Sequence, residues 1–135
     1  MLRLVVAYLL AAVAFGALDA VWLTQSYTQI YLPQIGALTR PTPEPMASLV
    51  FYLVYLAGLV RFAVAPGVSR DGVARAMVNA ACFGCVAYAT YDLTNLATLK
   101  GWTVTVSVVD MAWGTVASAI AAGISTGLTR RLFKV

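Results

Sequence analysis

The chain contains no histidine and few charged side chains, and both shortages restrict what it can be. Without histidine it lacks the commonest metal ligand and the commonest general base. Charged residues make up only 10% of its 135 residues, against about 25% in an average soluble domain. It also has no Gly-rich phosphate loop and no serine–histidine–aspartate set. These absences argue against the common hydrolase, metalloenzyme and nucleotide-binding classes.

Apolar residues, by contrast, make up 61% of the chain, more than a soluble protein of this size can bury. A lipid bilayer is therefore the expected environment. The net charge of +4 does not indicate a nucleic-acid partner, because the basic residues lie at the ends of apolar stretches and form no patch on polar surface.

Four stretches have the roughly 20 mostly apolar residues that a membrane-spanning helix needs. They predict an all-α, polytopic transmembrane four-helix bundle, a single domain over residues 1–135, with spans at about 2–24, 46–65, 73–99 and 103–128. An outer loop is expected at 26–45, where the prolines at 41, 43 and 45 oppose a helix. A secretory signal is the alternative for the first stretch, but that stretch is long for one and continues through Asp19 and Trp22.

The distribution of lysine and arginine predicts the orientation in the membrane. If the N-terminus is inside, only Arg40 and Lys100 lie outside. The inner side then carries seven basic residues, namely Arg3, Arg61, Arg70, Arg75, Arg130, Arg131 and Lys134. Four spans return the C-terminus to the starting side, so we expect an N-in/C-in protein of the cell inner membrane.

Three aspartates lie inside the predicted spans, where ionisable side chains are costly and mark functional sites. They are Asp19, Asp92 and Asp110. At 1.5 Å per residue, each lies roughly 8–10 Å below the outer interface. Three acids from three helices are therefore expected in one layer.

Aromatic and amide side chains accompany the acids at helical spacing. Asp19 shares a face with Trp22, and Asp110 with Trp113, so that an Asp-x-x-Trp pattern occurs twice. The two patterns lie on antiparallel spans and are expected to form two halves of one cluster. The predicted ligand-binding residues are Asp19, Trp22, Tyr52, Tyr55, Tyr88, Tyr91, Asp92, Asn95, Asp110 and Trp113.

Two interpretations of this layer stay open. Buried aspartates can simply hold helices together through tyrosine, asparagine and tryptophan donors. They can also hold a proton, a small cation or an amphiphile with a polar head, because clustered carboxylates in a low dielectric cannot all ionise without balancing charge. Aromatic rings beside carboxylates suit an organic cation.

Small residues and cysteines occupy the other half of the spans. Gly114, Ser118 and Ala122 recur at four-residue spacing, as do Ala12, Gly16 and Ala20. This spacing lets helices approach closely, within the bundle, in a homo-oligomer or against a larger membrane complex. Cys82 and Cys85 form a C-x-x-C pattern inside an apolar span, where we expect packing rather than redox chemistry. No metal site and no cofactor are expected.

The third predicted span and the start of the fourth carry the motif YATYDLTNLATL (88–99), then Trp102 and DMAWG (110–114). Together with Asp19-x-x-Trp22 and Phe51-Tyr52-x-x-Tyr55, this resembles the domain-of-unknown-function 2177 family of small bacterial membrane proteins. The resemblance covers nearly the whole chain. It implies a compact four-span inner-membrane protein, and it brings no established activity, substrate or cofactor.

Three functions follow as hypotheses. The first is a binding or transport module for a cation, proton or amphiphilic ligand in the outer half of the bundle. The second is an accessory or assembly subunit of a larger membrane complex. The third is a lipid-modifying membrane enzyme with an aspartate acid or base, although nothing in the sequence specifies an enzyme.

Overall fold

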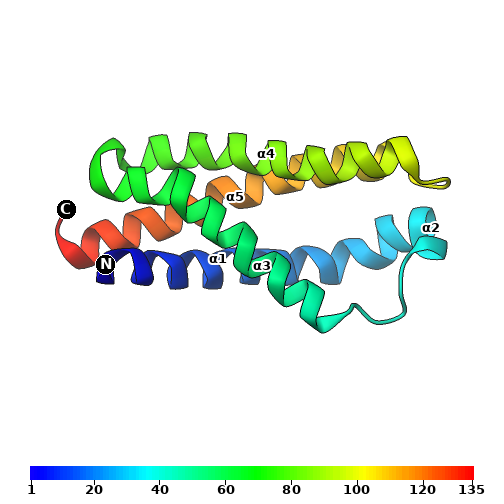
Figure 1. Cartoon of the computed structure of the whole chain (residues 1–135), viewed down its shortest axis with the longest axis horizontal. Coiled ribbons are helices and arrows are strands. Elements are labelled where there is room, and N and C mark those ends of the chain that lie inside the picture. Colours follow the sequence, from blue (N-terminus) through cyan, green and yellow to red (C-terminus); the bar gives the residue numbers. More distant parts are fainter.

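The computed structural model describes residues 1–135, and all of its regular elements are helical. Figure 1 shows long helices side by side, with both termini at one end of the molecule. The all-α prediction is confirmed. The long helices are α1 (Leu2–Ser26), α3 (Pro45–Leu59), α4 (Gly72–Thr98) and α5 (Val104–Phe133), and the short elements are η1 (Tyr27–Tyr31), α2 (Leu32–Ile35), η2 (Gly36–Leu38), η3 (Val60–Val64) and η4 (Gly67–Asp71).

Three continuous helical stretches are long and apolar enough to cross a membrane, namely Leu2–Leu38, Pro45–Thr98 and Val104–Phe133. The structure therefore counts three where the sequence predicts four. The difference arises because the predicted spans 46–65 and 73–99 are joined by the π-helical turn η4 rather than by a loop. η3 lies within the first of these two spans. Within this middle stretch the chain reverses direction between α3 and α4 (Figure 1). Gly72, the first residue of α4, has a φ of +78°, which suits a residue without a side chain.

The predicted outer loop is largely helical. Residues 27–38 continue from α1 through η1, α2 and η2, so that only residues 39–44 are outside a helix before α3. Pro33 does not prevent this, because it lies in the first turn of α2, where its missing N–H is tolerated. α5 also continues to Phe133, five residues beyond the predicted end of the fourth span.

Side-chain caps fix where α3 and α5 begin. The Glu44 carboxylate accepts hydrogen bonds from the backbone N–H groups of Met46 and Ala47, at the start of α3. Thr103 accepts from the N–H of Val106 at 3.2 Å and donates to Oε1 of Gln34 at 2.6 Å. Thr103 therefore both starts α5 and attaches α2 to it.

α4 and α5 share the most extensive interface of the molecule, and glycines make it possible. A Cβ atom on Gly84 would lie far inside contact distance of the Gly114 carbonyl and of Ser118. A Cβ on Gly114 would meet the ring of Tyr88. Gly114 and Ser118 of α5 therefore pack within the bundle, which is one of the three possibilities that the sequence leaves open. The cysteines are free, and Cys82 lies exposed on the surface of α4 rather than in packing.

α3 stands apart from the other long helices along most of its length. It has few contacts with α1 and α4, and η3, at its far end, makes most of the connection (Figure 1). The principal core accordingly lies among α1, α5 and the end of α3 near η3. Its fully buried apolar side chains include Ala7, Ala11, Phe15, Leu59, Ala63, Val64, Ala80, Ala117, Ala121 and Ala122.

Candidate functional site

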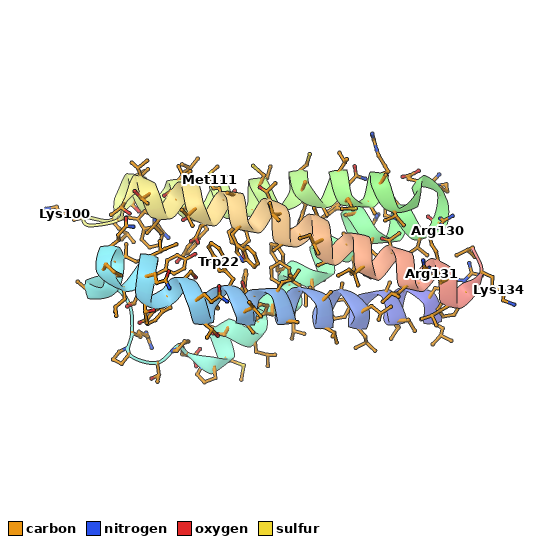
Figure 2. All side chains as sticks on the ribbon, turned by 180° about the vertical axis from the view of Figure 1, so that it is seen from behind. Trp22, Lys100, Met111, Arg130, Arg131 and Lys134 are labelled. Atoms are coloured by element: carbon orange, nitrogen blue, oxygen red, sulfur yellow. The ribbon has the colours of Figure 1, made fainter.

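The predicted site residues come from four helices and lie in the half of the molecule that ends at Lys100, which we call the Lys100 half. Figure 2 shows Lys100 at one end of the bundle, Arg130, Arg131 and Lys134 at the other, and Trp22 between the helices. α1 supplies Asp19 and Trp22, α3 supplies Tyr52 and Tyr55, α4 supplies Tyr88, Tyr91, Asp92 and Asn95, and α5 supplies Asp110 and Trp113.

Asp19 is buried and fully hydrogen-bonded. The Tyr52 hydroxyl of α3 donates to its Oδ2, and the Trp113 indole N–H of α5 donates to its Oδ1 at 3.1 Å. Asp19 is 7% exposed. One carboxylate of α1 therefore holds two other helices, which is the structural role that the sequence leaves open for it.

The second Asp-x-x-Trp pattern is connected to the first in a crossed arrangement. Trp22 donates its indole N–H to the Tyr31 hydroxyl at 3.0 Å, and Tyr31 donates to Oδ1 of Asp110. The rings of Trp22 and Trp113 stack, with centroids 4.6 Å apart and planes at 7°. The two patterns thus form one cluster. Trp113 of α5 donates directly to Asp19 of α1, and Trp22 of α1 is linked to Asp110 of α5 through the Tyr31 hydroxyl.

Tyr31 is a member of this cluster that the sequence analysis placed in a loop. It is buried together with Ile35, and both pack on Val106 and Trp102. The helical continuation of α1 through η1 brings the Tyr31 hydroxyl over Asp110. The tyrosine content of segment 26–45 was the only signal for it, and that signal fits a membrane-interface belt equally well.

Asp92 differs from the other two acids, because it is completely buried and neither carboxyl oxygen accepts a hydrogen bond from a hydroxyl or N–H donor. Its own backbone carbonyl accepts a hydrogen bond from Ser107 of α5 at 3.4 Å. The Asp110 carboxyl, one turn further along α5, is a near neighbour of the Asp92 carboxyl. A buried carboxylate without donors lowers the free energy of unfolding, and binding of a proton or a cation offsets this cost.

The tyrosines of α3 and α4 are arranged around the cluster at different depths. Tyr55 is buried and shares a 2.6 Å hydrogen bond with Ser118 of α5. Tyr88 packs edge-on against Tyr55, with ring centroids 6.1 Å apart. Tyr91 is 58% exposed and packs edge-on against Trp102. Asn95 is partly exposed, and its side chain is a neighbour of the Tyr91 hydroxyl.

Two cavities adjoin these residues. A cavity of about 490 Å³ lies between α3 and α4, with Asp110 of α5 in its wall. A second cavity, of about 350 Å³, lies beside α1 and the 39–44 segment, and its wall includes Asp19, Trp22, Asp110 and Trp113. The two cavities share Ser48, Phe51, Tyr88, Tyr91 and Asp110. Asp19 and Asp110 therefore line a common space, whereas Asp92 lies behind Asp110 and lines neither cavity.

No group of three or more histidine, cysteine, aspartate or glutamate side chains is close enough to hold a metal ion. The three aspartates therefore lie near one another, but their carboxyl groups do not converge on one metal-sized site. No basic side chain balances them within it, because Arg40 and Lys100 are exposed, and Lys100 extends away from the helices in Figure 2.

The comparisons with known proteins agree with the helices and with the motif. The family described as "Predicted membrane protein (DUF2177)" matches residues 4–127, which include all ten predicted site residues. No curated protein and no solved structure matches the chain. The match covers far more than half of the sequence, so the chain belongs to the domain-of-unknown-function 2177 family of predicted membrane proteins.

Proposed function

We propose that this protein is a four-span, N-in/C-in protein of the bacterial inner membrane that binds a small cationic or protonated ligand in the outer half of its bundle. The proposed outer half is the Lys100 half. The ligand is expected at Asp110, among the tyrosines of α3 and α4, with the charge of the neighbouring Asp92 carboxyl adding to its attraction. Asp19 and the two tryptophans are expected to hold the helices around it.

The length of the middle helical stretch supports four crossings. Residues 45–66 form about 33 Å of helix, and residues 72–98 about 40 Å, so each alone can cross a hydrocarbon core of about 30 Å. The reversal of the chain between α3 and α4 supports two passages in opposite directions (Figure 1).

The charges at the ends of the bundle support the orientation. Both termini lie at the same end in Figure 1, and Arg130, Arg131 and Lys134 are at that end in Figure 2. The opposite end carries Lys100 and, in the 39–44 segment, Arg40. An excess of basic residues marks the cytoplasmic side.

The binding proposal is carried by the Asp92 carboxyl, which is fully buried, accepts no hydrogen bond from a hydroxyl or N–H donor, and lies next to the Asp110 carboxyl. A purely structural aspartate is expected to resemble Asp19, with donors on both oxygens. Two neighbouring carboxyls with no basic residue in their layer are stabilised by a shared proton or by a bound cation.

Titration of the purified protein with tetramethylammonium chloride tests this proposal. The fluorescence of Trp22 and Trp113 reports binding, because both line the smaller cavity. We expect Asp110→Asn and Asp92→Asn each to weaken binding about tenfold or more. Asp71→Asn, an exposed residue at the opposite end, serves as the matched control and is expected to leave binding unchanged. Equal binding by all four proteins, or none by the wild type, would refute the proposal.

A second candidate function, an accessory subunit of a larger membrane complex, is favoured by one surface of α1. A Cβ atom on Gly16 would meet nothing within 4 Å, and Ala20, one turn further, is exposed. Such a small-residue face allows close approach of a helix from another protein. Co-purification of a stoichiometric partner that is lost in Gly16→Leu would support this candidate, and a monodisperse monomer would oppose it.

A further inference from the structure

The larger cavity gives the proposed ligand site a side opening. Its lining comes from α3 and α4, with no third helix between them except at the inner wall. Two of its residues, Phe51 and Tyr91, are respectively 47% and 58% exposed, so they form the rim rather than the interior. In a membrane this rim faces the acyl chains of the outer half, because both residues lie on spanning helices.

The route from the outer surface is closed where α2 covers α5. Tyr31 and Ile35 are buried there, and the hydrogen bond between Thr103 and Gln34 fixes α2 to the start of α5. Trp102 adds a second cover, with its indole N–H donating to Ser107 at 3.1 Å. Asp110 can therefore be reached in two ways, through the larger cavity between α3 and α4 and through the smaller cavity beside the 39–44 segment. Only the larger one opens toward the lipid between two spanning helices.

The residues that line the larger cavity favour an amphiphilic ligand. Six of the eight lining residues are hydrophobic, and Asp110 is the only charged one. The rings of Phe51, Tyr55, Tyr88 and Tyr91 line the same cavity as this single carboxyl. Aromatic faces beside a carboxylate bind ammonium groups, and the apolar remainder suits a hydrocarbon chain. The absence of a basic side chain in the lining opposes an anionic head.

We infer that the ligand is a membrane-resident amphiphile with an ammonium head, which passes sideways between α3 and α4 and places its head at Asp110 and its chain along Ala47, Phe51 and Ala87. This inference rests on the proposed cation site. The cavity volume of about 490 Å³ lies within the range of roughly 300–1,000 Å³ that small-molecule sites occupy. The weak attachment of the outer part of α3 leaves the passage free to widen.

Two probes with the same ammonium head distinguish the contribution of the apolar cavity to binding from that of the Asp110 carboxyl. Dodecyltrimethylammonium has a chain for the cavity, whereas tetramethylammonium has only the head. Retention of each by the protein in maltoside micelles is measured by native mass spectrometry. In Ala47→Phe, a new ring at the exposed rim blocks the cavity from α3 without entering the core. In Ala87→Phe the same ring blocks it from α4. Ala112→Phe, exposed on α5 and lining neither cavity, is the matched control.

We expect both cavity variants to lower retention of dodecyltrimethylammonium about tenfold and to leave retention of tetramethylammonium unchanged. Ala112→Phe is expected to retain both probes as the wild type does. If neither variant lowers retention of the long probe, the sideways passage is wrong, while tetramethylammonium binding that depends on Asp110 still upholds the cation site. If dodecyl sulfate is retained as well as the ammonium probe, the assigned head chemistry is wrong. If no probe depends on Asp110, both this inference and the proposed function fail.

Discussion

Trp22 of α1 and Trp113 of α5 stack with their ring centroids 4.6 Å apart and their planes 7° from parallel. Each indole N–H points to a different partner, Trp113 to Asp19 and Trp22 to Tyr31, which in turn donates to Asp110. The pair therefore joins two acids on two helices into one rigid wall. α3 has few backbone contacts with this wall and is joined to it by the hydrogen bond from Tyr52 to Asp19.

Removal of the Tyr31 hydroxyl is expected to destabilise the bundle. In Tyr31→Phe the Trp22 N–H and one oxygen of Asp110 both lose their partner, which costs about 1–3 kcal/mol of unfolding free energy. Thermal unfolding in detergent micelles measures the loss. Tyr27→Phe is the matched control, since Tyr27 is exposed and its hydroxyl has no hydrogen bond, and it should be neutral. Equal stability of the two variants would contradict the role given to Tyr31.

Replacement by alanine is expected to change the free energy of unfolding in opposite directions at Gly84 and at Gly16. Gly84→Ala places a methyl group against the Gly114 carbonyl and Ser118, and separating α4 from α5 to fit it costs about 1–3 kcal/mol. Gly16→Ala meets nothing within 4 Å and should stabilise α1 by about 0.5–1 kcal/mol through helix propensity. Unfolding of both variants under one set of conditions checks the sign of each effect. A destabilised Gly16→Ala would indicate that α1 is packed against another molecule.

Arg130 is expected to matter more than its neighbour Arg131. Arg130 donates from Nη1 to the carbonyls of Gly67 and Val68, at 3.0 and 3.1 Å, and so fixes the turn between α3 and α4 to α5. Arg130→Ala should therefore cost about 1–2 kcal/mol of unfolding free energy. Arg131 is exposed at the same end, so Arg131→Ala removes the same charge without removing these hydrogen bonds. Its free energy of unfolding should differ from that of the wild type by no more than about 0.5 kcal/mol. A comparable loss in both variants would mean that charge, rather than the two hydrogen bonds, is responsible.

Patterns of composition and spacing predict the helices and the residue types of the site well, but not its connections. Hydrophobic length finds α1, α4 and α5 to within a few residues at most ends, because a span must satisfy its backbone internally. It does not reveal that π-helical turns join α3 to α4 without a loop. Depth counting brings Asp19, Asp92 and Asp110 to one layer, yet it cannot distinguish a saturated carboxylate from an unpartnered one. That distinction depends on Tyr52, Trp113 and Tyr31, whose directions follow from tertiary packing alone.

The contrast between Asp19 and Asp92 gives the sharpest test of which acid supports the fold and which supports binding. Asp19→Asn keeps the size of the side chain, but one of its two donors then faces an NH₂ group. We expect it to lower the unfolding free energy by about 1–3 kcal/mol.

Asp92→Asn acts on a carboxyl that has no donor to lose and an acid as its neighbour. Replacing it with a neutral amide removes the cost of a buried charge, so the stability of the ligand-free protein should rise or stay the same. The same substitution should weaken tetramethylammonium binding, which links the stability gain to a functional loss. Thermal unfolding with and without the probe measures both effects in one experiment. A large loss of stability in Asp92→Asn, equal to that of Asp19→Asn, would instead make Asp92 a structural residue, because a carboxyl that accepts hydrogen bonds in the folded protein loses them when one oxygen becomes an NH₂ group.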